Sequence, residues 1–109
     1  MTPERLNRDS AFHQKGEVLL AMARAAIARQ LGMDSSTPAT PEWLDAPGAV
    51  FVTVTQNEQL RGCIGSLEAW RPLRDDLDAN ARAAAFGDPR FAPLSAEELA
   101  RTRIEVSIL

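Results

Sequence analysis

Two β-prone runs on either side of a short polar turn restrict the fold of this chain more than any other feature. The first run, AVFVTVT at residues 49–55, is rich in β-branched and aromatic residues, and the second, QLRGCIG at residues 59–65, follows after a few positions. Such runs flanking a turn are typical of a β-hairpin. The sequence therefore predicts two adjacent antiparallel strands joined around Asn57 and Glu58.

The register of the predicted hairpin depends on the length of its loop. If the two turn residues alone form the loop, Cys63 lies opposite Val52 and Arg61 lies opposite Val54. A turn of this type requires a positive φ at both loop positions, and Glu58 is poorly suited to that conformation. A longer loop with a β-bulge therefore remains an open alternative.

A long helix is predicted before the hairpin. Its apolar residues recur at helical spacing between an N-cap at Asp9 or Ser10 and a left-handed C-cap at Gly32. Residues 33–48 carry three prolines and many turn-forming side chains, which predicts a connecting loop. A flexible linker would not carry a large aromatic residue, so we expect Trp43 to hold this loop against the body of the protein.

Two further helices and a strand are predicted after the hairpin. The first helix covers residues 70–87 and stops at Gly87. Its buried stripe consists of Leu73, Leu77, Ala81 and Ala84. A capping box of Ser95 and Glu98 begins a short helix, and residues 103–109 alternate as a half-buried strand. These elements predict an α+β fold in which an antiparallel sheet, containing the hairpin, is flanked by helices.

The charge balance argues against a protein that binds nucleic acid. The chain has 12 basic and 15 acidic residues and a formal net charge of -3, whereas domains that bind the phosphate backbone concentrate basic residues on one face. No stretch approaches the roughly 20 apolar residues of a membrane span, and the N-terminus lacks a signal-peptide pattern. We therefore expect neither nucleic acid nor a membrane as a partner, and the single cysteine fits a reducing cytoplasm.

Cys63 is the only cysteine and lies between two glycines. One cysteine can form neither an internal disulfide nor a metal-binding pair, and we expect no metal and no cofactor. Alternation along the strand gives two faces, which are Arg61, Cys63 and Gly65 on one side and Leu60, Gly62 and Ile64 on the other. Arg61 could then stabilise a Cys63 thiolate. The alternative is that Cys63 packs as a small buried side chain.

Other residues of chemical interest also have structural explanations. Glycine within a strand marks a bulge or a close approach by a ligand or a backbone, and packing of the 70–87 helix would also explain it. His13 lies in the first turn of its predicted helix, where a surface role is more common than catalysis. Asp75 and Asp76 lie in the first turn of the second helix and compensate its dipole. No glycine-rich phosphate loop is present.

Several motifs together resemble one known family. LRGCIG at 60–65, LEAWRPL at 67–73, DPRF at 88–91 and IEVSIL at 104–109 are similar to the AMMECR-type domain, known in bacteria as AmmeMemoRadiSam system protein A. The resemblance begins near residue 17, and many relatives have Asn-Gly where this chain has Asn57-Glu58. The matched signature residues are Leu60, Arg61, Gly62, Cys63, Ile64, Gly65, Asp88, Pro89, Arg90 and Phe91.

The resemblance implies an α+β domain with an antiparallel sheet, flanking helices and a smaller subdomain. Since the family's domain continues beyond IEVSIL and this chain ends on an apolar strand residue, we expect residues 1–109 to be the N-terminal portion of a single domain that lacks its C-terminal part. The family's biochemical activity is not established. The resemblance implies two partners, a Memo-type protein similar to extradiol dioxygenases and a radical SAM protein.

Two functional hypotheses follow from the signature strand. The first is a cytoplasmic accessory or binding domain, in which the LRGCIG face forms a pocket for a small molecule or a surface for a partner protein. The second is a thiol enzyme in which Cys63 is the nucleophile or redox group, Arg61 stabilises its thiolate, and backbone N–H groups at Gly62 or Gly65 hold an oxyanion. A nucleic-acid regulator is a third hypothesis, which the acidic balance disfavours.

Overall fold

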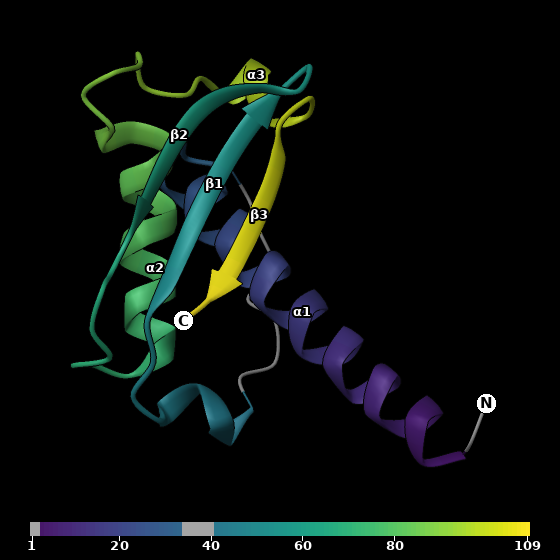
Figure 1. Cartoon of the computed structure of the whole chain (residues 1–109). Coiled ribbons are helices and arrows are strands. Elements are labelled where there is room, and N and C mark those ends of the chain that lie inside the picture. Colours follow the sequence, from purple (N-terminus) through teal and green to yellow (C-terminus); the bar gives the residue numbers. More distant parts are fainter. Residues whose placement is uncertain (1–2, 34–40) are drawn as a thin grey trace.

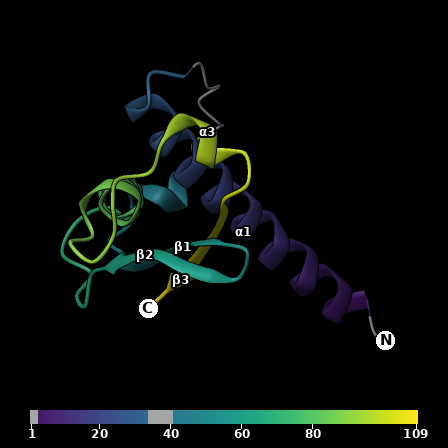
Figure 2. The same cartoon turned by 90° about the horizontal axis from the view of Figure 1, so that it is seen from above.

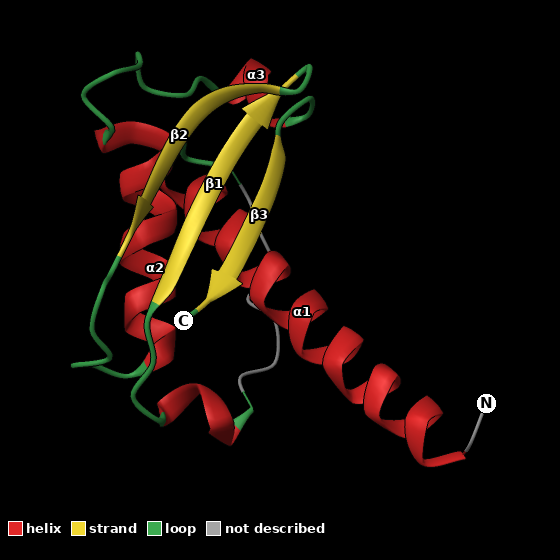
Figure 3. Ribbon diagram, in the orientation of Figure 1, coloured by secondary structure: helices red, strands yellow, loops and turns green. Residues whose placement is uncertain are grey.

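The structure, a computed structural model, describes the backbone of residues 3–33 and 41–109, and the side chains of residues 15–33 and 41–109. The predicted α+β class is confirmed (Figure 3). The elements in chain order are α1 (Pro3–Gln30), the 3₁₀ turn η1 (Glu42–Asp45), β1 (Val50–Gln56), β2 (Gln59–Gly65), α2 (Leu73–Arg82), the π-helical turn η2 (Ala83–Gly87), α3 (Ala96–Leu99) and β3 (Arg103–Ile108).

The three strands form one antiparallel sheet in the order β2-β1-β3. Figures 1 and 2 show that the helices packed on this sheet all lie on the same side of it. The expectation of flanking helices is therefore correct for one face, whereas in the described part of the chain the other face is uncovered. The N-terminal half of α1 extends beyond the sheet in both views.

The core lies between the sheet and the helices. Val50, Val52 and Val54 alternate along β1 and are fully buried on the helical side, because successive side chains of a strand point to opposite faces. Ile27 of α1 and Leu77 of α2 are buried against them. The predicted stripe of α2 is confirmed, since Leu73, Leu77, Ala81 and Ala84 are all buried. The opposite face of β1 consists of half-buried residues, which are Phe51, Thr53 and Thr55.

The first helix begins earlier than its sequence predicts. It starts at Pro3 rather than at a cap by Asp9 or Ser10, so these two residues lie inside the helix. Proline is tolerated in the first turn because the N–H groups there have no partner within the helix. The predicted end is confirmed, since Gly32 follows the helix with a φ of 76°, the left-handed conformation that glycine adopts readily. The side chain of His13 lies outside the described residues.

The second helix begins later than predicted. Pro72 is its N-cap rather than a residue of its first turn, with φ -54° and ψ 142°, and the helix itself starts at Leu73 because this extended conformation precedes it. The predicted stop at Gly87 is confirmed, although the last turn is π-helical from Ala83 onward. The capping box is also confirmed, as the side chain of Ser95 accepts a hydrogen bond from the Glu98 N–H and the Glu98 carboxylate accepts one from the Ser95 N–H.

The connecting loop before β1 is held against the body, as Trp43 predicts. The Lys15 ammonium group of α1 lies 5.4 Å from the centre of the Trp43 ring, a distance at which a cation is attracted to the face of an aromatic ring. The next residue, Leu44, is fully buried in the core. The contact of Lys15 with Trp43 and the burial of Leu44 therefore hold η1 against the body of the protein, directly before β1 in the sequence.

A buried carboxylate connects α2 to the start of the sheet. Asp76 is fully buried, and its oxygens accept hydrogen bonds from the Val50 N–H at 2.9 Å, the Ser66 hydroxyl at 2.6 Å, Arg71 Nε at 2.9 Å and Asn80 Nδ2 at 3.0 Å. Burial alone would raise the pKa of Asp76, but the hydrogen bonds from Ser66, Val50 and Arg71 outweigh it and hold this pKa below its ordinary value. Asp76 therefore has a role beyond the expected dipole compensation, because its carboxylate joins α2 to Val50, Ser66 and Arg71.

The hairpin turn has the two loop residues that the first of the two registers requires. Asn57 has φ 49° and Glu58 has φ 65°, so both adopt the left-handed conformation of a type I′ turn. Next to the turn, Gln56 pairs with Gln59 and Thr55 pairs with Leu60. Glu58 was expected to fit this position poorly, and its positive φ does strain the backbone, because its Cβ disfavours that conformation.

We expect Glu58→Gly to stabilise the protein by about 0.5 to 1 kcal/mol, because glycine adopts a positive φ without a steric cost. The measurement is the urea concentration at the midpoint of unfolding. Glu58→Ala is the matched control, because it removes the same carboxylate and keeps the Cβ. An equal gain in both variants would show that charge, and not the turn conformation, causes the effect.

Candidate functional site

The hairpin contains a bulge that decides where its signature side chains point. Val54 pairs with Gly62 and Thr55 pairs with Leu60, so Arg61 is the additional residue between two pairs. Beyond the bulge the predicted register is wrong, because Cys63 lies opposite Thr53 rather than Val52. The bulge left open as an alternative is present, but it accompanies a two-residue loop. An additional residue of this kind redirects a side chain and the strand after it.

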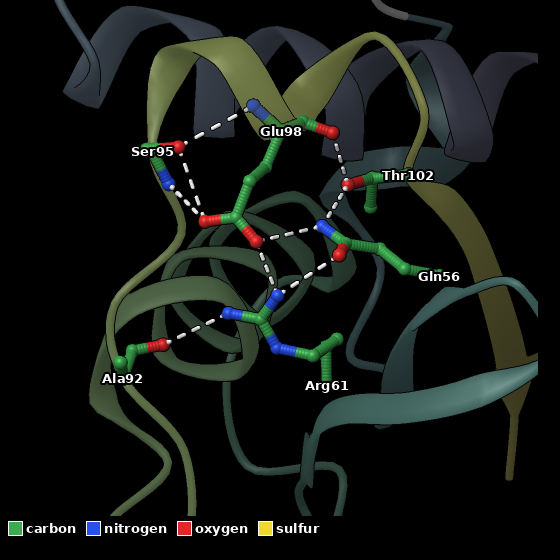
Figure 4. Close-up of polar contacts among 6 residues, drawn as sticks. All are labelled: Gln56, Arg61, Ala92, Ser95, Glu98 and Thr102. Atoms are coloured by element: carbon green, nitrogen blue, oxygen red, sulfur yellow. Dashed lines mark hydrogen bonds and ion pairs between the residues drawn. The ribbon is translucent and has the colours of Figure 1, made fainter.

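Arg61 was predicted to lie beside the Cys63 thiol, and this prediction is wrong. Its guanidinium contacts the Glu98 carboxylate of α3 and donates a hydrogen bond to Gln56 Oε1 at 3.0 Å (Figure 4). Glu98 also accepts a hydrogen bond from Gln56 Nε2 at 3.0 Å, and Thr102 accepts one from the same nitrogen at 3.1 Å. Arg61 therefore joins the hairpin to α3 on the helical side of the sheet, and it is unavailable to stabilise a thiolate at Cys63.

The pKa of Glu98 depends on the hydrogen bonds of this cluster. Hydrogen bonds from Arg61, and next from Gln56 and the Ser95 N–H, lower the pKa of Glu98 from 4.5 to about 2. A carboxyl group whose pKa is lowered by folding gives stability that is present above its unfolded pKa and is lost as the pH falls towards its folded pKa. The cluster should therefore weaken between about pH 4.5 and pH 2.

We expect Glu98→Gln to remove part of this pH dependence. Above pH 5 the variant should be less stable than the wild type by on the order of 2 kcal/mol, because the Arg61 guanidinium loses its charged partner at a partly exposed site. Between pH 4.5 and pH 2 the two proteins should converge in stability. The measurement is urea unfolding at a series of pH values, and a constant difference over that range would contradict the assigned origin of the pKa shift.

The two glycines of the signature strand are in close contact with different groups. A Cβ atom on Gly62 would lie 1.9 Å from the carbonyl oxygen of Ala84 in η2, which confirms close packing by the second helix as the explanation for this glycine. A Cβ atom on Gly65 would lie 2.2 Å from the ring of Phe51. The hollow expected beside the thiol at Gly65 is thus filled by an aromatic ring on the uncovered face.

Cys63 lies on the uncovered face and is half-buried. Its sulfur lies 3.3 Å from the Thr53 hydroxyl. Its backbone N–H, on the outer edge of β2, donates a hydrogen bond to Asp88 Oδ2 at 3.1 Å. The two resemblance motifs, LRGCIG and DPRF, therefore meet at this residue. A fully buried position in the core, which was the structural alternative for Cys63, does not describe it.

Asp88 and Arg90 form a charged pair beside the thiol. Asp88 is 4% exposed, and Arg90 donates to it from Nε at 3.1 Å and from Nη2 at 2.8 Å. The hydrogen bonds from the Arg90 side chain, and next from the Cys63 N–H, hold the pKa of Asp88 well below its usual range. Asp88 in turn raises the pKa of Arg90, and Cys63 makes a smaller contribution in the same direction. The arginine linked to Cys63 is therefore Arg90 and not Arg61, because Asp88 bridges the Arg90 guanidinium and the Cys63 N–H.

The outer side of this pair is open. The Arg90 side chain is 56% exposed, and its guanidinium carbon lies 5.3 Å from the centre of the half-buried Phe91 ring. The structure thus brings together Cys63, Asp88, Arg90 and Phe91 from the predicted set. Gly62 and Ile64 instead pack on the helical side, and Leu60 is 39% exposed near the turn. Arg61 also lies on the helical side, with Glu98, but it contacts the end of the same loop, since its Nη2 donates to the Ala92 carbonyl at 3.4 Å.

Two contributors were not predicted from the sequence. Thr53 faces Cys63 only because the bulge shifts the register, and no local pattern in β1 indicates that pairing. The sequence identified Glu98 only as a capping residue, although a carboxylate is also the usual partner of an arginine side chain.

Among the described residues, no group of three histidine, cysteine or acidic side chains could hold a metal ion. No helix in that part of the chain is long and apolar enough to cross a membrane.

The fold and the site define a class of protein. It is an α+β domain whose antiparallel sheet has helices on one face. The edge strand of this sheet carries a cysteine between two glycines, and an Asp-Pro-Arg-Phe loop binds that strand through Asp88. Residues 20–109 match the AMMECR1 family. The chain belongs to that family, as the sequence motifs indicated.

Relatives and a solved structure agree with this assignment. A protein of Saccharolobus islandicus is 44% identical over 101 residues, covering 86% of this chain and 44% of the relative. A protein of Methanothermobacter thermautotrophicus is 40% identical over 98 residues, covering 87% of this chain and 51% of the relative. The crystal structure of the uncharacterized protein PH0010 from Pyrococcus horikoshii has a TM-score of 0.76 and 37% identity, covering 85% of this chain and 50% of that one. The chain thus spans about half the length of the proteins it matches.

Proposed function

We propose that this chain is an accessory domain that binds a partner protein or a small molecule through one surface. The surface consists of Thr53, Cys63, Asp88, Arg90 and Phe91, and we call it the thiol surface. The observation that carries the proposal is the hydrogen bond from the Cys63 N–H to Asp88. It joins the strand that carries Cys63, whose sulfur lies 3.3 Å from the Thr53 hydroxyl, to the loop that carries the half-exposed Arg90 guanidinium and the Phe91 ring.

The chemistry of the thiol surface suits binding better than catalysis. Asp88 is satisfied by Arg90 and by a backbone N–H, so its carboxylate is committed to holding the loop. Arg90 still has exposed donors beside an aromatic ring, an arrangement that recognises carboxylates, phosphates and flat rings. Arg61, the arginine expected to activate Cys63, is engaged with Glu98. The surface therefore offers recognition groups that are already positioned.

The proposed partners come from the motif resemblance. AmmeMemoRadiSam system protein A occurs beside a Memo-type protein similar to extradiol dioxygenases and beside a radical SAM protein. We propose that these two proteins act with this chain in the cytoplasm as parts of one pathway. An exposed arginine next to an aromatic ring is among the side-chain types that dominate protein interfaces, which supports a role in contacting either of them.

Co-expression tests this proposal. The tagged chain is produced together with the Memo-type and radical SAM proteins of the same genome, and copurifying proteins and small molecules are identified by mass spectrometry. We expect Arg90→Ala to reduce recovery of the partner by at least about tenfold, as loss of an interface arginine commonly does. Arg101→Ala is the matched control, because Arg101 is exposed and lies outside the thiol surface.

Recovery of neither protein and of no small molecule with the wild-type chain would overturn the proposal. Equal losses for the Arg90 and Arg101 variants would show that the thiol surface is not the contact. Circular dichroism of each variant distinguishes loss of binding from loss of fold, because Arg90 also neutralises the buried Asp88.

A thiol enzyme is the second candidate, and the connection of Arg90 through Asp88 to the backbone of the half-buried Cys63 favours it. In this alternative Arg90 takes the role first expected of Arg61. A nucleophilic thiol should be alkylated by iodoacetamide at pH 7 faster in the folded chain than in urea, and Arg90→Ala should remove the difference. Slower alkylation of the folded chain would reject the enzyme and leave the binding domain.

A further inference from the structure

A hollow between α1 and α2 is lined mainly by polar side chains. It has a volume of about 410 Å³, and its lining consists of Ala26, Arg29, Gln30, Asp78 and Arg82. Both helices lie on the helical side of the sheet (Figures 1 and 2), and the hollow shares no residue with the thiol surface. Sites that hold small molecules in proteins usually have volumes of roughly 300 to 1,000 Å³, so this hollow has the size of such a site.

Two arginines in the hollow share one carboxylate. Arg29 Nη2 donates a hydrogen bond to Asp78 Oδ1 at 3.2 Å. Arg82 Nε donates one to Asp78 Oδ2 at 2.9 Å, and Arg82 Nη2 lies 2.8 Å from the same oxygen. Asp78 is the only acidic residue of the lining. The two guanidinium groups and the carboxylate therefore carry a net charge of +1.

The packing of the two helices does not explain the second arginine. Asp78 and Arg82 are four residues apart on α2, a spacing at which an ion pair forms within a single helix. Asp78 therefore already has a partner, and Arg29 adds a positive charge without adding a carboxylate. An exposed ion pair of this kind contributes little to stability. A bound anion would account for Arg29, because the anion would neutralise the additional charge.

Both arginines have unused donors. A guanidinium group has five N–H donors in a planar fork, and in the described part of the chain Asp78 is the only group that accepts from either arginine. The side chain of Arg29 is 49% exposed and that of Arg82 is 46% exposed. Gln30 contributes an exposed amide, which can donate and accept, and Ala26 contributes a buried methyl group. Asp78 thus positions two guanidinium groups whose remaining donors are accessible.

We propose that this hollow binds a small organic acid through a carboxylate group. One carboxylate accepts from the remaining N–H groups of Arg29 and Arg82 and brings the net charge of the hollow to zero. A phosphate group, with a charge of about -2, would leave the hollow negative beside Asp78. The amide of Gln30 suits a second polar group on the same ligand. This inference does not depend on what the thiol surface binds.

A titration followed by NMR tests the inference. The full chain is labelled with ¹⁵N, and the side-chain Nε–Hε signals of its arginines are recorded at pH 6 while N-acetylglycine is added. This probe has one carboxylate and one amide. We expect saturable shifts at Arg29 and Arg82, with a midpoint on the order of 1 mM. N-acetylglycinamide, in which a neutral amide replaces the carboxylate, should give no saturable shift.

Two substitutions show whether the shifts come from this hollow. Arg29→Gln should raise the midpoint measured at Arg82 by at least about tenfold, because the ligand loses one of its two charged donor groups. The variant should stay folded, since Arg29 is exposed and its ion pair contributes little to stability. Arg101→Gln is the matched control, because it removes the same charge from an exposed position outside the hollow. It should leave the midpoint unchanged.

Three outcomes would overturn the inference. The first is the absence of a saturable shift with N-acetylglycine. The second is an equal shift with N-acetylglycinamide or with sodium chloride, because the carboxylate would then not be what the hollow recognises. The third is tighter binding of inorganic phosphate than of N-acetylglycine, because the hollow would then be a phosphate site.

Discussion

Gly62→Ala should be among the most damaging single substitutions in this protein, with an expected loss of about 3 kcal/mol or more in the free energy of unfolding. The new Cβ would lie 1.9 Å from the Ala84 carbonyl oxygen. That oxygen belongs to the backbone of η2, whose residues Ala84 and Ala85 are buried in the core. Neither the strand nor the helix can move away without disturbing the core packing. Urea unfolding followed by circular dichroism gives the loss.

Two other glycines provide controls for this prediction. At Gly65 the atoms nearest to the new Cβ belong to the ring of Phe51, at 2.2 Å and 2.5 Å. A side chain can move further than the backbone oxygen that opposes Gly62, so we expect a smaller loss of about 1 to 2 kcal/mol. At Gly16 nothing lies within 4 Å, and alanine should leave stability unchanged or raise it by up to about 1 kcal/mol. Similar losses at Gly62 and Gly65 would contradict the close approach of η2 to the strand.

Asp76→Ala should lower the free energy of unfolding by about 3 to 5 kcal/mol. The substitution leaves the Val50 N–H without its acceptor and removes the partner of the Arg71 guanidinium. Both groups lie where α2, the start of β1 and the loop after β2 meet. An N–H group buried without a partner costs free energy because water no longer satisfies it. Chemical denaturation at pH 7 measures the effect.

Asp75→Ala is the matched control, because Asp75 is the preceding residue in the same first helical turn and is exposed. Its loss should stay within about 0.5 kcal/mol, the usual range for an exposed position with weak interaction with the helix dipole. Equal effects at the two positions would mean that the dipole, and not the buried network, explains the role of Asp76.

The elements of the fold could be predicted because their determinants are local. The hairpin runs, the left-handed residue at Gly32, the stop at Gly87 and the capping box at Ser95 each depend on a few adjacent residues. The start of α1 could not be placed, because residues 3–8 have no strong helix signal and an internal Asp9 resembles a cap. The buried hydrogen-bond network of Asp76 could not be predicted either, because the groups that donate to it come from three separate segments.

The candidate site was predicted by its motifs but not by its geometry. The resemblance named Asp88 and Arg90 as residues of a second motif, without placing them near Cys63, and the structure connects the two motifs. The expected pairing of Arg61 with the thiol was wrong, because strand alternation holds only for a regular ladder and the bulge interrupts it. The partner of Arg61 lies in α3, and only the tertiary fold brings that helix to the hairpin.

The bulge at Arg61 also determines how the hairpin would tolerate a change in length. Removing residue 61 would leave Gly62 opposite Val54 and Cys63 opposite Thr53, because residue 61 pairs with nothing in the ladder. Removing or adding one residue between Gly62 and Gly65 would instead exchange the two faces of the strand beyond that point. We therefore expect natural and engineered variants of this hairpin to gain or lose a residue at the bulge or the turn, and to keep the four residues after the bulge uninterrupted.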